Sequence, residues 1–371
     1  MNSNRLYDVI VVGGGPAGSA CAAVLARNGL DVLLIDRARF PREKICGDCL
    51  NPRSWKTLEL IGAADAVRGA PHRRITGVQI ASWRGRSAHG FIPGKFREPF
   101  LAIRRAVLDQ ILLNNATTAG VTVLEETQVL RAEPGPTIRV ETSASTGLST
   151  FSCGYLVGAD GRNSIVAATN RVHVWSVLRR ERIGLQWFAR FQPLLGTEVV
   201  LLLLPYGYAG IVNVDEGSAN VAMSVDPRRV PRDHLAIPAM LMESLQSQEV
   251  LRNLARDLSP LSKILTAFPI QPRTNSSSHP RILLAGDARQ TAEPFTGEGI
   301  AFALSDGVEA ASAILRSEGR RFLKRGQSRN DFWVNHVYSP LLRHPKILDA
   351  GLRNAAVSSR LLSAAMRTVF R

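Results

Sequence analysis

The feature that most constrains this fold is a glycine-rich turn near the start of the chain, between a predicted strand and a predicted helix. Residues 7–12 are apolar and rich in branched side chains, as in a strand buried inside a parallel sheet. The hexapeptide GGGPAG follows at 13–18, and the alanine-rich stretch 19–29 predicts a helix that ends at Gly29. Residues 31–36 predict a second buried strand, so the chain begins with a βαβ unit.

The three glycines of this turn have the spacing of a dinucleotide-binding loop. Gly13 permits the tight turn, Gly15 lets the backbone approach a pyrophosphate, and Gly18 allows the helix to pack closely on the strand. The N-terminus of the helix adds a positive dipole end for the phosphate. Asp36 ends the next strand, where an acidic side chain binds a ribose hydroxyl. Such a loop does not by itself distinguish FAD from NAD.

The rest of the chain predicts an α/β fold with a discontinuous Rossmann-type domain. Four strand-like runs separated by turns over 184–226 predict an antiparallel sheet, after which the pattern returns to a buried strand at 281–287 and a helix at 298–316. The expected domains are a nucleotide-binding domain over 1–74, 100–172 and 276–318, a smaller substrate domain over 75–99 and 173–275, and C-terminal helices over 319–371. Within the last segment, residues 350–370 predict one amphipathic helix with a basic polar face.

The charge balance is unusual, with a formal net charge of +15 and a pI of about 10.6. The arginines are scattered and no nucleic-acid-binding motif accompanies them, so we expect no nucleic-acid partner. The basic segment 350–370 favours peripheral contact with an anionic membrane.

Four cysteines do not make a disulfide scaffold, and the apolar run 199–205 is too short to span a bilayer, so we expect a cytoplasmic protein. The sequence does not specify an oligomeric state.

Two distant segments, 158-GADGRNS-164 and 285–304, favour FAD over NAD as the bound nucleotide. Asp287 follows a buried strand, where its carboxylate can accept hydrogen bonds from a polyol such as the ribityl chain. Pro294, Gly297 and Gly299 then open a helix whose N-terminal amides can face the negative charge of a reduced flavin.

With these motifs in this order, the chain up to Arg316 resembles the superfamily of p-hydroxybenzoate-hydroxylase-type flavoproteins, which includes geranylgeranyl reductases and flavin-dependent halogenases. The resemblance implies that Asp160 and Gly161 contact FAD and a pyridine nucleotide, and that Arg105 lies near the ribityl and phosphate groups. It implies FAD contacts at Gly13, Gly15, Pro16, Ala17, Gly18, Asp36, Arg37, Arg105, Val129, Asp160, Gly161, Gly286, Asp287, Pro294, Gly297, Glu298, Gly299 and Ile300. There is no second GxGxxG, which fits a family in which NAD(P)H binds transiently as the reductant.

The segment 41-PREKICGDCLNPR-53 resembles a motif of the geranylgeranyl and menaquinone reductase branch, in which a Cys-Gly pair lies beside the flavin and the substrate. Cys46 and Gly47 match that pair and are catalytic candidates, with Cys46 as an orienting group or proton relay. Cys49 stands where the family usually has glycine. The CxxC could also be half of a zinc site or a redox dithiol, although no second pair of ligands accompanies it.

A weaker resemblance concerns the YxWxFP segment that lines the cavity of prenyl reductases. Tyr208 is retained and is our third catalytic candidate, but Gly210 replaces the tryptophan, which should widen the cavity for a bulkier or ring-bearing substrate. The same departure argues against a halogenase, whose WxWxIP segment is missing. The alternative is that 199–214 is only the core of a sheet.

The resemblance therefore predicts an FAD-dependent oxidoreductase that uses NAD(P)H to reduce a C=C bond of an isoprenoid or similar apolar small molecule. The alternative is a monooxygenase that hydroxylates an aromatic or polyketide ring through a flavin C4a-hydroperoxide, with His89, His173 or Tyr208 as the polar group. A flavoprotein that modifies a protein partner is a third candidate. The motifs at 158–164 and 285–304 argue against a plain Rossmann dehydrogenase.

Overall fold

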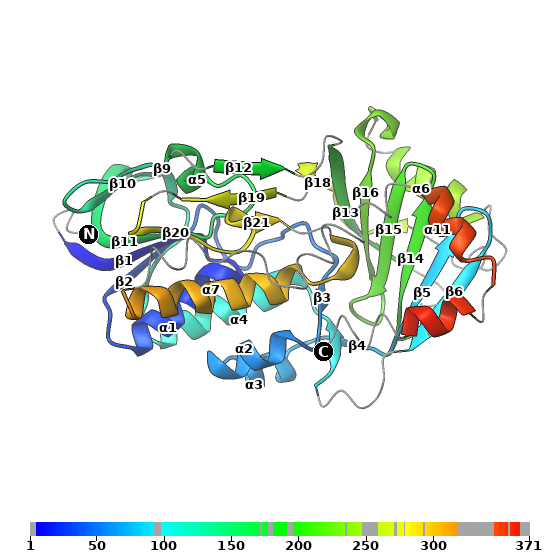
Figure 1. Ribbon diagram of the computed structural model, residues 1–371, viewed down its shortest axis with the longest axis horizontal. Coiled ribbons are helices and arrows are strands. Elements are labelled where there is room, and N and C mark those ends of the chain that lie inside the picture. Colours follow the sequence, from blue (N-terminus) through cyan, green and yellow to red (C-terminus); the bar gives the residue numbers. More distant parts are fainter. Residues whose placement is uncertain are drawn as a thin grey trace.

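The computed structural model describes residues 5–91, 98–170, 173–176, 181–190, 196–233, 236–246, 259–270, 273–277, 279–291, 294–317, 345–354 and 357–363. These residues form an elongated molecule with two lobes, each built on its own large sheet (Figure 1). Helix α7 (Gly299–Leu315) runs along the first lobe and begins where the two lobes meet.

In the described part of the chain, the first lobe has a seven-stranded sheet of order β8-β2-β1-β11-β10-β9, with β20 beside β11. Its strands are β1 (Leu6–Val12), β2 (Val32–Ile35), β8 (Thr122–Leu124), β9 (Gln128–Glu133), β10 (Ile138–Ala144), β11 (Gly147–Gly158) and β20 (Ile282–Leu284). Strands β8, β2, β1, β11 and β20 are mutually parallel, and β9 and β10 extend the sheet in antiparallel fashion. The parallel strands are almost wholly apolar because both of their faces are covered.

Helices α1 (Pro16–Arg27), α4 (Arg105–Thr118) and α7 lie together on one side of this sheet (Figure 1). Gly307 allows the close crossing of α1 and α7, and Gly286 lets the turn after β20 approach the same part of α1. A Cβ on Gly307 would lie 2.1 Å from the Ala17 carbonyl oxygen, and a Cβ on Gly286 would lie 3.0 Å from the Ala17 Cβ. The contact brings the start of α7 next to the glycine-rich turn, although the two are more than 280 positions apart in the sequence.

The second lobe has an eight-stranded sheet, as far as the structure describes it, of order β17-β13-β16-β15-β14-β5-β6 with β18 beside β13. The strands are β5 (Gly77–Ser82), β6 (Ser87–Phe91), β13 (Arg182–Arg190), β14 (Glu198–Leu204), β15 (Gly207–Asn213), β16 (Ala219–Val225), β17 (Ser259–Pro260) and β18 (Leu265–Ile270). The sheet is antiparallel as expected, except that β14 pairs with β5 in parallel. Helix α6 (Ala236–Gln246) covers one face through Ile237, Leu241 and Leu245.

Smaller elements complete the fold. They are α2 (Ser54–Leu60), α3 (Ala64–Gly69), α5 (Ile165–Thr169), the sheet of β3 (Cys49–Leu50), β4 (Arg73–Ile75) and β7 (Phe100–Ala102), and the sheet of β12 (His173–Ser176), β19 (Arg273–Ser276) and β21 (Gln290–Thr291). The predicted fold class is confirmed: an α/β nucleotide-binding architecture with an antiparallel second sheet and C-terminal helices.

The single helix predicted over 350–370 is wrong at its start. Helix α11 (Pro345–Gly351) ends at a glycine, and residues 352–354 form a turn. The Asn354 side-chain oxygen then accepts a hydrogen bond of 3.1 Å from the Val357 amide, so Asn354 caps a new helical segment over 357–363. No helix in the described residues is long and apolar enough to cross a membrane.

Candidate active site

The glycine-rich turn has the backbone geometry that its spacing predicts. Gly13 has a φ of +102°, and a Cβ there would lie 2.4 Å from the Ala159 carbonyl oxygen. A Cβ on Gly18 would lie 1.8 Å from the Gly13 carbonyl oxygen, so the helix could not pack on the turn. Gly15 differs, because the nearest atom to its Cβ would be Arg42 Nη2 at 3.6 Å. Gly15 therefore faces open space at the N-terminus of α1.

Asp36 ends β2 and is held in place by two backbone amides. The Gly14 amide donates to Oδ2 at 2.6 Å and the Ala38 amide donates to Oδ1 at 2.8 Å. These bonds couple the carboxylate to the glycine-rich turn, and lone pairs remain on both oxygens for further donors.

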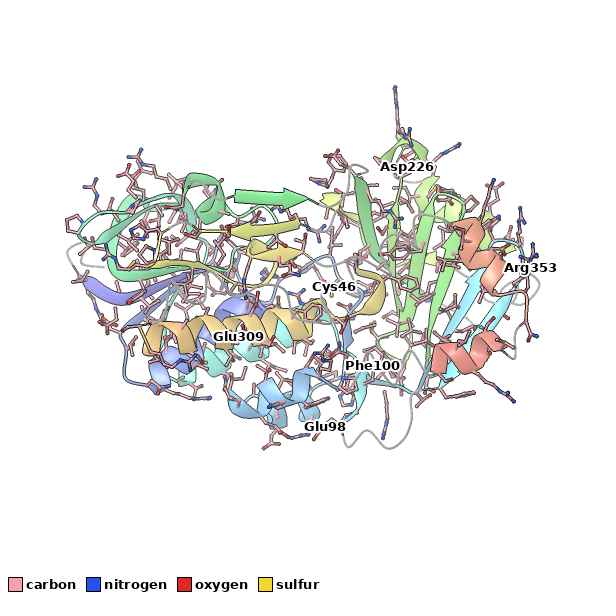
Figure 2. The ribbon with its side chains drawn as sticks, in the orientation of Figure 1. Cys46, Glu98, Phe100, Asp226, Glu309 and Arg353 are labelled. Atoms are coloured by element: carbon pink, nitrogen blue, oxygen red, sulfur yellow. The ribbon has the colours of Figure 1, made fainter. Side chains whose placement is uncertain are left out.

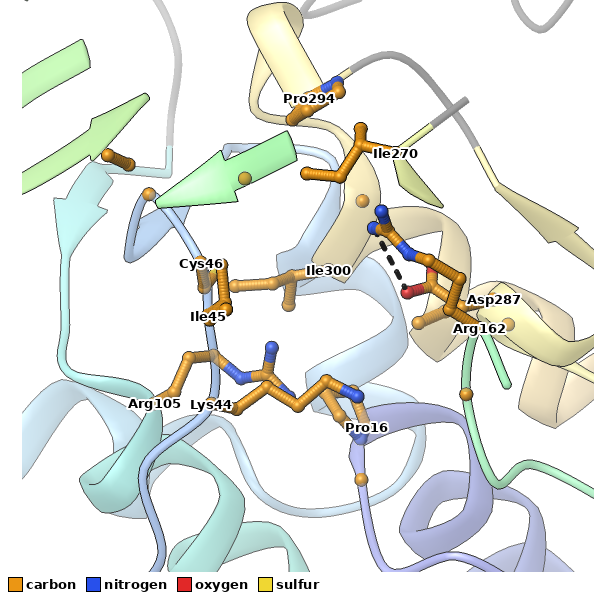
Figure 3. Close-up of a pocket in the computed structure, with 18 of the residues that line it drawn as sticks. Pro16, Lys44, Ile45, Cys46, Arg105, Arg162, Ile270, Asp287, Pro294 and Ile300 are labelled. Carbon is orange, nitrogen blue, oxygen red and sulfur yellow. Dashed lines mark ion pairs between the residues drawn. The ribbon is translucent and has the colours of Figure 1, made fainter. Parts of the chain in front are cut away.

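A cavity of about 660 Å³ runs from this turn to the sheet of the second lobe. Figure 3 shows Lys44, Cys46, Arg105, Asp287 and Ile300 around it. Most of the site residues predicted from the sequence line this one space: Gly13, Gly15, Pro16, Ala17, Asp36, Arg37, Cys46, Gly47, Arg105, Val129, Asp160, Gly161, Tyr208, Gly286, Asp287, Pro294, Gly297, Gly299 and Ile300. The two predicted residues outside its lining are Gly18, which packs under the turn, and Glu298.

Sequence reasoning missed two cations beside the turn, Arg42 and Lys44. Arg42 lies 3.1 Å from the buried carboxylate of Asp109, which also accepts two hydrogen bonds from Arg105 at 2.8 and 2.7 Å. A Cβ on Gly161 would lie 3.0 Å from Lys44 Nζ. Burial, together with Arg105 and Arg42, lowers the pKa of Lys44, so an anion placed among these groups would be favoured. The only sequence signal was the charged run that precedes Cys46.

On the opposite wall, Asp287 pairs with Arg162 across 4.0 Å (Figure 3). Asp306 of α7 holds the backbone next to Asp287. Its carboxylate accepts a hydrogen bond of 3.1 Å from the Gly286 amide and one of 2.6 Å from Arg289. Burial raises the pKa of Asp306 to about 6. The packed helix thus positions Asp287, and Arg162 is a further cation that sequence reasoning missed.

The N-terminus of α7 opens onto the same cavity. Gly297 has a φ of +67°, and a Cβ on Gly299 would have no atom within 4 Å, so the backbone here faces open space. Glu298 points away from the cavity and accepts a hydrogen bond of 2.9 Å from Arg53. This ion pair joins the start of α7 to the loop that carries Cys46.

Cys46 lies in the middle of the molecule, between the two lobes (Figure 2). Its carbonyl oxygen accepts a hydrogen bond of 2.9 Å from the Asn220 side chain, and Asn220 also donates to Asp48 at 2.6 Å. Its thiol interacts with the guanidinium of Arg105. Burial raises the pKa of Cys46, so the thiol is the stable form at neutral pH.

The two cysteines of the CxxC have different surroundings. Cys46 packs against the core that contains Leu50 and Ile300, whereas Cys49 packs against the apolar cluster of the second sheet. The Cys49 thiol donates to the Gly47 carbonyl oxygen at 3.2 Å, and burial raises its pKa. Within the described residues, no three His, Cys, Asp or Glu side chains gather as a metal site would require.

The second sheet presents an apolar face to the cavity. Alternation along β15 places Ala209 and Ile211 against α6, so Tyr208, Gly210 and Val212 face the cavity. A Cβ on Gly210 would have its nearest neighbour, Leu201 Cδ2, at 3.5 Å, so the glycine leaves a shallow space. The Tyr208 ring meets Phe295 edge to face at 5.2 Å.

The two histidines considered as catalytic bases do not join this group. His89 is close to half exposed, lies 3.4 Å from Glu198, and is not among the residues that line the cavity. The side chain of His173 lies outside the described part of the structure.

The residues present fit FAD. The turn at Gly15 is open to a diphosphate, Arg42 and Lys44 lie within reach of it, and Asp36 stands at the ribose position. The cavity continues past the start of α7 to Gly47, where a Cβ would again meet no atom within 4 Å. An extended dinucleotide with a planar ring at its far end matches this path.

Comparison with known proteins agrees with this geometry. Residues 6–181 match the family model described as FAD binding domain. The menaquinone reductase of Mycolicibacterium smegmatis is 28% identical over 384 residues, covering 99% of this chain and 92% of that protein.

Solved structures share the fold. The myxobacterial chondrochloren halogenase CndH superposes with a TM-score of 0.75 at 18% identity, covering 98% of this chain and 97% of that one. An aklavinone-11 hydroxylase, solved with FAD and aklavinone, superposes with a TM-score of 0.70 at 22% identity, covering 85% of this chain and 64% of that one.

The fold, the cavity and these similarities define the class: the protein is an FAD-dependent oxidoreductase. The proteins to which the chain is similar are named as a reductase, a halogenase and a hydroxylase. The predicted cofactor FAD and the predicted enzyme class are confirmed.

Proposed function

We propose that this protein reduces a C=C bond of an isoprenoid-bearing apolar substrate, such as a prenylated quinone, with NAD(P)H as the electron donor. The observation that carries the proposal is the single cavity that joins the glycine-rich turn to an apolar sheet face, with the Cys46 thiol at the junction. The similarity to a menaquinone reductase over nearly the whole chain supports the same substrate class.

When bound, FAD would supply the two-electron redox chemistry that connects NAD(P)H to the substrate. The amides at the start of α1 and the side chains of Arg42 and Lys44 bind its diphosphate, and Asp36 binds the ribose of its adenosine. Asp287 binds the ribityl hydroxyls. Backbone amides at Gly297 and Gly299, at the start of α7, would stabilise negative charge on the bound cofactor.

Cys46 provides the proton that must reach the substrate carbon opposite to the hydride. Burial keeps its thiol protonated, and the Arg105 guanidinium lies where it stabilises the thiolate left after proton transfer. Gly47 lets the substrate approach the backbone beside Cys46. Tyr208 and the apolar face around Gly210 exclude water and orient the substrate.

The proposal is tested with protein that NADH or NADPH has reduced in the absence of oxygen. Addition of a prenylated naphthoquinone should reoxidise the flavin at a rate that saturates with substrate, and the product should gain two hydrogens in its side chain. Unchanged reduced flavin under these conditions would reject the reductase.

The second candidate is a monooxygenase. It is favoured by Gly210, since the space at that position suits a ring, and by the fold shared with a hydroxylase crystallised with aklavinone. In that case substrate addition would couple NAD(P)H oxidation to oxygen consumption, and the product would gain one oxygen atom.

The proposed domain boundaries are those expected from the sequence: 1–74, 100–172 and 276–318 for FAD, 75–99 and 173–275 for the substrate, and 319–371 for the C-terminal helices. A cytoplasmic location with peripheral contact to anionic lipid forms part of the proposal. The net charge of +15 supports it, because an apolar substrate of this class is taken from a membrane.

A further inference from the structure

The C-terminal segment reaches back to the substrate cavity. Leu362 lines the cavity together with Val78, Val199 and Val212, which come from three strands of the second sheet. It lies in a helical segment that is more than 140 positions beyond the last of those strands. The segment is therefore part of the wall and not a separate tail.

The sheet has space for this leucine because of one glycine. Gly90 lies on β6 opposite Val78, and a Cβ at Gly90 would lie 2.7 Å from Leu362 Cγ and 3.0 Å from Cδ2. A Cβ at this position would require Leu362 to move. The nearby Leu361 is 66% exposed, so only one of the two adjacent leucines is used in this way.

Two serines hold the segment in register on β6, which is an edge strand of the sheet in the described part of the chain. The His89 amide donates to the Ser359 hydroxyl at 3.1 Å, and the Phe91 amide donates to the Ser363 hydroxyl at 3.3 Å. Four helical residues advance about 6 Å and two strand residues about 6.7 Å, so the two spacings match. The serine hydroxyls thereby accept hydrogen bonds from the two β6 backbone amides at the sheet edge, which could otherwise pair with another strand.

A second anchor lies in α11. Asp349 is buried, accepts a hydrogen bond of 2.6 Å from Ser82, and pairs with Arg86 and with Arg84 at 3.7 Å. Leu348 of this helix and Leu352 of the turn that follows it pack against Leu203 and Tyr208 on the cavity side of the sheet. The segment is thus attached at both of its ends, and Leu362 has a defined place.

We propose that Leu362 determines which apolar substrate fits, by closing the end of the cavity where the isoprenoid chain terminates. The inference rests on the proposed function and names the residue that limits chain length. The wall of the cavity around Leu362 suits a hydrocarbon chain, because its side chains are all apolar: Val78, Val199, Val212 and Phe100.

The test uses Leu362→Ala and Leu362→Trp in the full chain with bound FAD, and Leu361→Ala as the matched control. kcat/KM is measured for prenylated naphthoquinones of increasing chain length. The alanine variant should favour longer chains and the tryptophan variant shorter ones. Each should change the ratio of kcat/KM for long and short chains by about tenfold, which is the discrimination that one or two methylene groups give in an apolar pocket. FAD content and the rate of flavin reduction by NAD(P)H should not change, and Leu361→Ala should match the wild type.

An equal loss on all chain lengths, or the same shift in Leu361→Ala, would overturn the inference. If the wild type reduces none of these compounds, the proposed function fails separately. Titration of the oxidised protein with linear prenyl alcohols, followed through the flavin absorption spectrum, then decides the inference. The chain-length dependence of binding must shift in Leu362→Ala but not in Leu361→Ala, and an absence of that shift contradicts the role given to Leu362.

Discussion

The side-chain amide of Asn220 donates a hydrogen bond of 2.6 Å to the carboxylate of Asp48, and the two residues are 172 positions apart in the chain. Asp48 follows Cys46 in the loop of the first lobe, and Asn220 lies on β16 of the second. The same carboxylate accepts the Arg105 amide at 3.2 Å, so it joins the cysteine loop to α4 and to the second sheet. Asp48 has a φ of 54°, which these two contacts maintain.

The first prediction concerns Asn220→Ala. The change leaves a buried carboxylate and the Cys46 carbonyl without their side-chain donor, so the free energy of unfolding should fall by about 1–3 kcal/mol. Turnover should fall more than FAD affinity does, because the position of Cys46 changes. Ser224→Ala is the control, since Ser224 is buried on the same face of β16 and its hydroxyl has no hydrogen-bond partner within the described structure. Comparable losses from both variants would show that Asn220 has only a packing role.

The second prediction is a pH dependence of stability that comes from Asp48. Burial raises its pKa from 3.8 to about 7, and the hydrogen bond from Asn220 opposes part of that rise. A pKa raised in the folded state gives a contribution to stability that is complete below the unfolded value and is lost as the pH rises through the folded value. The free energy of unfolding of the wild type should therefore decrease between about pH 4 and about pH 7, by at most about 4 kcal/mol.

Urea denaturation across this range checks the prediction, with Asp48→Asn as the comparison. The variant should lack this part of the pH dependence, although it also loses one acceptor and is less stable at low pH. Parallel curves for the two proteins would contradict the raised pKa.

The third prediction separates the two cysteines. Cys46→Ala should lower turnover by about 10²-fold or more and leave FAD content unchanged, as expected for the loss of a proton donor. Cys46→Ser should retain part of the activity. Cys49→Ala should have little effect, because its side chain packs in the apolar cluster and not against Arg105. Equal losses at the two positions, with a disulfide detected by mass after oxidation, would instead establish a redox dithiol.

The fourth prediction uses two glycines of the same turn. Gly15→Ala should fold normally, because the nearest atom to the new Cβ is 3.6 Å away, but FAD affinity should fall at least about tenfold. Gly18→Ala should destabilise the protein itself by about 2–4 kcal/mol, because its Cβ would lie 1.8 Å from a backbone oxygen. Thermal unfolding of the FAD-free and FAD-bound forms distinguishes the two effects. A Gly15→Ala protein with unchanged FAD affinity would contradict the assignment of the diphosphate site.

The fifth prediction tests the width of the cavity. Gly210→Trp should reduce kcat/KM for ring-bearing substrates by about tenfold or more and spare linear prenyl substrates, because an indole would occupy the space beside Leu201. Gly210→Ala is the control and should have a small effect. A uniform loss across both substrate classes, with normal FAD content, would mean that the space at Gly210 is not used by the substrate.

Much of the nucleotide half of the site could be predicted from short stretches of sequence. The glycines are recognisable because a tight turn and a close approach of the backbone to a diphosphate require glycine at Gly13, Gly15 and Gly18. Asp36 is recognisable because an acidic residue at the end of the next strand binds the ribose. Arg42 and Lys44 were not recognisable in the same way. Nothing local distinguishes an arginine near a phosphate from the many other arginines of this basic chain.

The sequence by itself determined the βαβ unit, the alternating strands of the second sheet and the identity of the cofactor, since these depend on backbone conformation and on local patterns of burial. The tertiary structure alone decided that Asn220 holds the loop of Cys46, that Cys46 and Cys49 face different clusters, and that Leu362 lines the cavity. Each of these relationships depends on contacts between segments far apart in the chain. Such contacts are set by packing, and no local pattern of residues encodes them.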